Sequence, residues 1–136
     1  MKRALLSILT LSLLLAGSAH ADHHAGKVLK FKGGEGPGKG KKIVLVSGDE
    51  EYRSEESMPM LGKILSQTHG FDCVVVFSWD KEGKFIDPNH SQGLIGLSEL
   101  NDADLMIIGT RFRQPVPEEA AHLTAFMNKG KPVIGI

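Results

Sequence analysis

The sequence lacks several features that would point to a particular class of protein. It has one cysteine, so no internal disulfide can form. It has one tryptophan and one tyrosine, and its 16 basic residues are balanced by 16 acidic ones. A chain without net charge has no long-range attraction for nucleic acid or for an anionic membrane, so we expect neither as a partner. The 41% of hydrophobic residues excludes a chain that is disordered throughout.

No apolar run is long enough to cross a membrane as a helix, and the longest one is typical of an export signal. Lys2 and Arg3 precede the apolar segment 4–15, and Ala19 and Ala21 are the small residues that a signal peptidase requires. We therefore expect a signal peptide over residues 1–21, with cleavage after Ala21. The mature protein would be periplasmic or secreted, without stable membrane insertion.

Residues 22–41 are predicted to form a flexible linker that is rich in glycine and lysine. Gly33, Gly38 and Lys39 have the spacing of a phosphate-binding loop, but Gly40 replaces the Ser or Thr that would hold magnesium. The segment also precedes a strand, whereas a phosphate loop follows a strand and opens a helix. The sequence therefore predicts no nucleotide site there. No cofactor and no metal site are predicted elsewhere, because the histidines lack the spacing of a zinc site.

Residues 42–136 are predicted to form the N-terminal part of an α/β domain. Continuous apolar runs, which are typical of parallel strands buried on both faces, occur at 42–47, 71–78, 103–109 and 132–136. Their alternation with helical patterns predicts a doubly wound parallel sheet, as in a flavodoxin-like three-layer sandwich, with strand order 2-1-3-4. The fourth strand needs a covering helix that the sequence does not contain, so we expect the domain to be incomplete at its C-terminus.

Helical spacing predicts two main helices between these strands. The first could be capped by Ser54 or Ser57, and Pro59, which is tolerated in a first turn, favours Ser57. This helix is expected to end near Gly70, and the second is expected to begin at Pro117. A short helix is expected over 94–100. The residues expected to face the core are Met60, Leu61, Ile64 and Leu65 in the first helix, and Ala120, Leu123, Phe126 and Met127 in the second.

Polar side chains follow the first and third strands, at the edge where ligands bind in doubly wound sheets. The first loop contains five carboxylates within residues 49–56, and the third places two arginines around Phe112, which is expected to pack inward. Carboxylates and arginines can form paired hydrogen bonds to a sugar, and tyrosine can stack on it. Alternatively, the arginines pair with the acids of the first loop. The residues predicted to bind a ligand are Asp49, Glu50, Tyr52, Arg53, Arg111 and Arg113.

Three segments resemble the ThuA-like (trehalose-utilisation) domain family. They are KKIVLVSGDEEYRSEESMPMLGKIL, DLMIIGTRFRQ and GKPVIGI, and they cover residues 41–65, 104–114 and 130–136. The sequence is similar in particular to exported proteins of that family. The resemblance implies a fold similar to the class I glutamine-amidotransferase-like superfamily and a role in sugar or glycoside metabolism. It also implies that further site residues follow the strand at 133–136, so that the catalytic part is missing from this chain.

Three functions stay open at this point, and with them the question of whether the chain is an enzyme. The expected one is an exported ThuA-like protein that handles a sugar or glycoside in carbohydrate utilisation. The alternatives are a non-catalytic module that binds polyols or glycosides, and an inactive fragment. The expected partner is a small, sugar-like molecule, and the sequence does not distinguish a monomer from a homo-oligomer.

Overall fold

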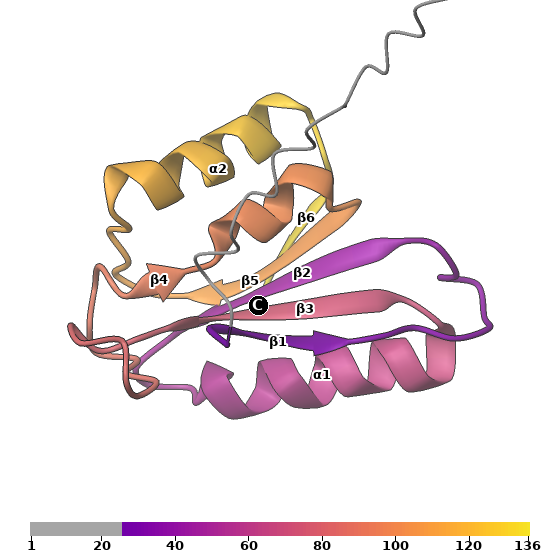
Figure 1. The fold of residues 1–136 in the computed structure, drawn as a ribbon, viewed down its shortest axis with the longest axis horizontal. Helices are drawn as coiled ribbons and strands as arrows, with labels where there is room; N and C mark the ends of the chain where they lie inside the picture. The colour runs from indigo at the N-terminus through magenta and orange to yellow at the C-terminus, as the bar shows by residue number, and fades with distance from the viewer. Residues whose placement is uncertain (1–25) are drawn as a thin grey trace, which may run out of the picture.

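Residues 26–136 of the computed structural model form a mixed sheet with helices on both faces (Figure 1). The predicted signal peptide lies outside the described residues. The elements in chain order are β1 (Val28–Phe31), β2 (Lys42–Gly48), α1 (Ser54–His69), β3 (Asp72–Ser78), β4 (Leu94–Ile95), the 3-10 helix η1 (Leu97–Asp102), β5 (Leu105–Thr110), α2 (Pro117–Asn128) and β6 (Val133–Gly135).

The sheet confirms the predicted α/β class and the predicted order of the four apolar strands. Its order is β1-β3-β2-β5-β6, and β4 pairs with the end of β3. The β2–β3, β2–β5 and β5–β6 pairs are parallel. The chain leaves β2 for β3 on one side and leaves β5 for β6 on the other. The strand order therefore reverses between β2 and β5, which places a topological switch point at their carboxyl ends.

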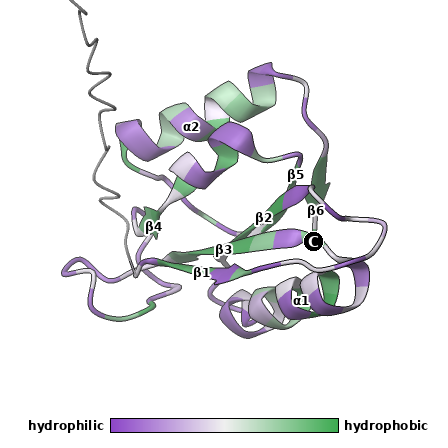
Figure 2. Cartoon of the chain, turned by 45° about the vertical axis from the view of Figure 1, so that its right-hand side comes forward, coloured by the Kyte–Doolittle hydropathy of each residue, from purple (hydrophilic) through white to green (hydrophobic). Residues whose placement is uncertain are grey.

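Each face of the sheet carries its own apolar cluster. Successive side chains of a strand point to opposite faces. On one face, Leu45, Val75 and Ile107 pack with Met58 of α1. On the other face, a second cluster that includes Val44 packs against η1 and α2. Figure 2 shows hydrophobic strands between helices that carry hydrophilic residues. The central strands are buried on both faces, so their continuous apolar runs follow from their position.

Strand β1 lies within residues 22–41, so the prediction of a flexible linker is wrong for residues 28–31. This strand pairs antiparallel with the edge of β3. The glycine-rich segment that follows is also held in place, because the Gly38 amide donates to the His69 carbonyl at 2.8 Å. A Cβ atom at Gly38 would lie 2.4 Å from the Phe71 ring. A Cβ atom at Gly33 or Gly36 would likewise lie within 2.5 Å of the backbone at the end of α1, so these glycines allow a close approach of the two segments.

Helix α1 begins one turn earlier than predicted, so Ser57 is not its cap. The N-cap residue is Arg53, which has a left-handed φ of 53°. The buried positions are Ser54, Met58, Gly62 and Ser66, whereas Met60 and Ile64, which were expected to face the core, are exposed. The pattern of apolar residues predicted the wrong buried face of α1, because three of the four buried residues of this helix are serine or glycine.

Helix α2 begins at Pro117 as predicted, and Phe126 is buried, but Met127 is exposed. The expected short helix is η1, and it starts later than predicted, at Leu97. Glu119 is buried, although no sequence pattern indicates this. Its carboxylate accepts hydrogen bonds from the amides of Gly96 and Leu97 at 3.1 and 2.7 Å, so it caps η1 from the neighbouring helix.

Candidate functional site

The switch point between β2 and β5 brings together the two loops that were predicted to form the site. Ser47 and Gly48 pair in register with Gly109 and Thr110, so both strands end at the same level of the sheet. We call residues 47–54 and 109–113 the edge site. In doubly wound sheets this is the place where a ligand fits between two loops that diverge.

The first loop is held by its own side chains. The Ser54 hydroxyl accepts hydrogen bonds from the amides of Gly48 and Asp49 at 3.1 and 2.9 Å, and lies 3.0 Å from the Ser47 hydroxyl. Two amides fill both lone pairs of Ser54, so its proton is donated to Ser47. The buried Asp49 carboxylate accepts from the amides of Glu51 and Tyr52 at 2.7 and 2.8 Å. Asp49 therefore shapes the turn through its oxygen Oδ1.

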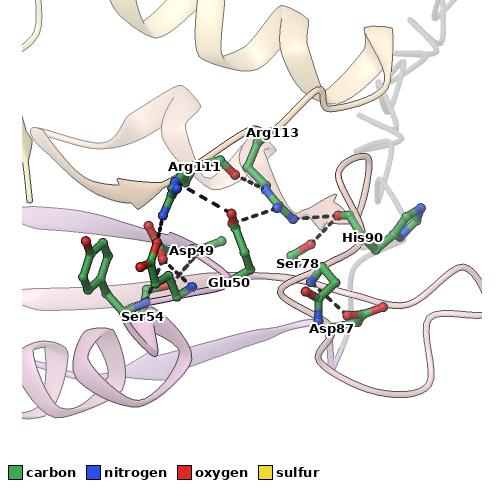
Figure 3. Close-up of polar contacts among 12 residues, drawn as sticks. Asp49, Glu50, Ser54, Ser78, Asp87, His90, Arg111 and Arg113 are labelled. Carbon is green, nitrogen blue, oxygen red and sulfur yellow. Dashed lines mark hydrogen bonds and ion pairs between the residues drawn. The ribbon is translucent and has the colours of Figure 1, made fainter.

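Arg113 joins three loops, and only 6% of its side chain is exposed (Figure 3). Its Nε donates to the Arg111 carbonyl at 2.7 Å, and its Nη1 donates to the His90 carbonyl at 3.0 Å. Its Nη2 pairs with Glu50 at 3.3 Å. The Ser78 hydroxyl also donates to the His90 carbonyl, at 2.8 Å. The guanidinium thus ties the loops after β2, β3 and β5 to one another.

Arg111 lies on the outer side of the same ion-pair group. Its guanidinium pairs with Glu51, and its Nε lies 3.8 Å from Glu50. It also lies 4.9 Å from the centre of the Phe112 ring. The prediction that Phe112 packs inward is wrong: it is 72% exposed, with a left-handed φ of 53°. This turn of the backbone directs Phe112 outward.

The structure brings together Asp49, Glu50, Arg111 and Arg113 of the six predicted residues, and it places the other two at the rim. Tyr52 is 74% exposed. Arg53 is exposed as well and pairs with Glu56 in the first turn of α1. The alternative that the arginines pair with the acids of the first loop is therefore confirmed for Arg111 and Arg113.

A cavity of about 170 Å³ opens between the two loops, on the face that α1 covers. Its lining consists of Asp49, Tyr52, Ser54, Ser57, Gly109 and Ile136. Ser54 and Ser57 are not among the six residues predicted from the sequence, because Ser57 was expected to cap the helix. Their hydroxyls could have been predicted as site groups only if the start of α1 at Ser54 had been known.

Other cavities lie outside the edge site. One of about 470 Å³ is formed by the loop after β3, including His90, and one of about 230 Å³ lies beside Lys30, Lys42 and Glu99. The charges of the second are paired, since Glu99 contacts both lysines. Burial opposes the charge on Lys42, but its hydrogen bonds to Asp102 and Glu99 outweigh this and raise its pKa. Neither cavity lies at the switch point.

Three further findings concern residues 26–136. Burial raises the pKa of the Cys73 thiol to about 11, as expected for a packing residue rather than a nucleophile. No group of three or more His, Cys, Asp or Glu side chains in this part of the chain is arranged to hold a metal ion. None of its helices has the length and apolar character needed to span a membrane.

These features define an α/β protein with a mostly parallel sheet and a polar site at its topological switch point. Comparisons with protein-family models, with curated proteins and with solved structures find no match to this chain.

Proposed function

We propose that this chain is an exported ThuA-like protein of the flavodoxin-like, class I glutamine-amidotransferase-like architecture, and that its edge site binds a sugar or glycoside. The observation that carries the proposal is the convergence of the loops after β2 and β5 at the switch point, where a cavity opens beside them. The segments that resemble the ThuA-like family include both loops. The observed strand order is compatible with that architecture.

The size of the cavity favours a ligand with one ring inside and the remainder at the rim. Its volume of about 170 Å³ is below the roughly 300–1,000 Å³ of sites that enclose a drug-sized molecule. Its walls offer the hydroxyl of Ser57 and the carboxylate of Asp49. The exposed ring of Tyr52 borders the cavity and can stack on the apolar face of a sugar.

One observation favours the second candidate function, a non-catalytic module that binds polyols or glycosides. The most buried charged groups of the edge site, Asp49 and Arg113, hold the loops in place through hydrogen bonds to the backbone. Groups that are engaged in this way shape a binding surface.

Titration calorimetry of the purified protein with glucose and with trehalose tests the proposal. We expect saturable binding that Tyr52→Ala weakens by a factor of about 2–12, because an aromatic contact contributes about 0.5–1.5 kcal/mol. Phe85→Ala is the matched control, since this ring is equally exposed but belongs to the loop after β3. Release of free glucose from trehalose would support an enzyme, whereas binding without turnover would support the module. Absence of binding to both sugars would refute the proposed function.

A further inference from the structure

The backbone amides of the edge site are filled by oxygen atoms of the chain itself. The turn between a strand and a helix N-terminus is a common anion site, because its amides point at the ligand. Here the amides of Gly48 and Asp49 donate to Ser54 Oγ, and those of Glu51 and Tyr52 donate to Asp49 Oδ1. An incoming phosphate or carboxylate would have to displace a hydroxyl and a carboxylate that are already in place.

The arginines of the edge site are also paired. Arg111 pairs with Glu51, and Arg113 pairs with Glu50 while it donates to two carbonyls. Arg53 pairs with Glu56. Arg113 is too deeply buried to contact a ligand, so Arg111, with 38% of its side chain exposed, is the cation of the ion-pair group that a ligand can reach.

We propose that the edge site rejects anionic ligands and accepts uncharged hydroxylated ones, and that Glu51 determines this selectivity. This inference rests on the proposed function for the choice of sugars as ligands. An anion that approaches Arg111 must displace Glu51 and comes close to Glu50, whose charge repels it. A neutral sugar meets no such cost, because its hydroxyls can donate to these carboxylates and accept from the guanidinium.

Glu51→Gln tests the role of Glu51, because the amide keeps the size of the side chain and removes its charge. Glu51 is exposed, so the substitution leaves the core unchanged. Glu56→Gln is the matched control: it removes an exposed carboxylate that also pairs with an arginine, but one outside the Glu50–Arg111–Arg113 group. Binding of glucose, glucose 6-phosphate and inorganic phosphate would be measured by calorimetry at low salt and again at 0.5 M NaCl.

We expect the unmodified protein to bind glucose at least about tenfold more tightly than glucose 6-phosphate. Glu51→Gln should bind glucose 6-phosphate and phosphate about tenfold or more tightly than the unmodified protein does, as one charge-assisted hydrogen bond gained implies. High salt should abolish the gain, and Glu56→Gln should show none.

Two results would overturn the inference: equal or tighter binding of glucose 6-phosphate than glucose by the unmodified protein, or no gain of anion binding in Glu51→Gln. Failure of the proposed function has a different signature, which is no binding of any neutral sugar. In that case a gain of phosphate binding in Glu51→Gln would still support the exclusion of anions by Glu51.

Discussion

Replacement of Arg113 by alanine should destabilise the protein more than replacement of any other arginine of the edge site. The substitution removes the side-chain donor to the Arg111 carbonyl and one of two side-chain donors to the His90 carbonyl, where Ser78 remains. It also leaves Glu50 with Arg111, at 3.8 Å, as its remaining ion-pair partner. The loop after β3 then loses its side-chain connection to the loops after β2 and β5.

The expected cost follows from these contacts. Each hydrogen bond to a carbonyl contributes about 1 kcal/mol, and the ion pair with the quarter-exposed Glu50 contributes about 1 kcal/mol more. We therefore expect the free energy of unfolding to fall by about 3 kcal/mol. Arg113→Lys should cost about 2 kcal/mol, because an ammonium group keeps the charge but lacks the planar fork that reaches three acceptors.

Urea denaturation followed by circular dichroism measures both variants. Arg53→Ala is the control, since an exposed pair at the start of a helix contributes less than about 0.5 kcal/mol. A double-mutant cycle with Glu50→Gln isolates the ion pair, for which we expect a coupling energy of about 1 kcal/mol. A loss below about 1 kcal/mol for Arg113→Ala would refute the view that this residue holds the three loops together.

Two further predictions concern regions outside the edge site. Gly38→Ala should lower the free energy of unfolding, measured by urea denaturation, by about 1–3 kcal/mol, because its methyl group would lie 2.4 Å from the Phe71 ring. Gly34→Ala is the control and should cause no such loss, since the space around Gly34 is open. Equal losses in the two variants would contradict the close packing of this segment. The Lys32 ammonium and the Gly33 amide hold the pKa of Asp72 below its ordinary 3.8, so its stabilising contribution is present above that pH and is lost as the pH falls through the lower folded value. Unfolding in urea at pH 2 to 6 should show this loss, and Asp72→Asn should reduce it; an unchanged pH dependence would exclude the pairing.

The central strands could be predicted from the sequence because their surroundings determine their composition. A strand covered on both faces must be apolar throughout, so β2, β3 and β5 can be recognised as continuous apolar runs. The strand order typical of flavodoxin-like sheets then predicts how they are arranged. Strand β1 gave no such signal. It has four residues and two exposed positions, and its pairing with the edge of β3 is a long-range contact that no local pattern encodes.

The position of the candidate site could be predicted from the sequence, but the orientation of its side chains could not. Its position follows from the ends of β2 and β5, and four of the six predicted residues do come together there. The inward packing of Phe112 was inferred from an extended loop with alternating sides. The left-handed backbone at Phe112 breaks that alternation, and nothing in the residue type requires it, since glycine or asparagine would be expected at such a φ.

The two arginines of the third loop show why residue types alone could not assign ligand contacts. Arg111 and Arg113 have the same chemistry and both flank Phe112, so any argument from composition treats them alike. Burial separates them. The Arg113 side chain is enclosed by the carbonyls of Arg111 and His90 and by Glu50, and it donates to all three. Arg111 keeps a side that faces solvent. A loss of binding in an Arg113 variant would therefore report on the positions of the loops. Direct contact with a ligand has to be tested at Arg111, Glu51 and Tyr52, whose side chains are exposed to solvent in part or in the main.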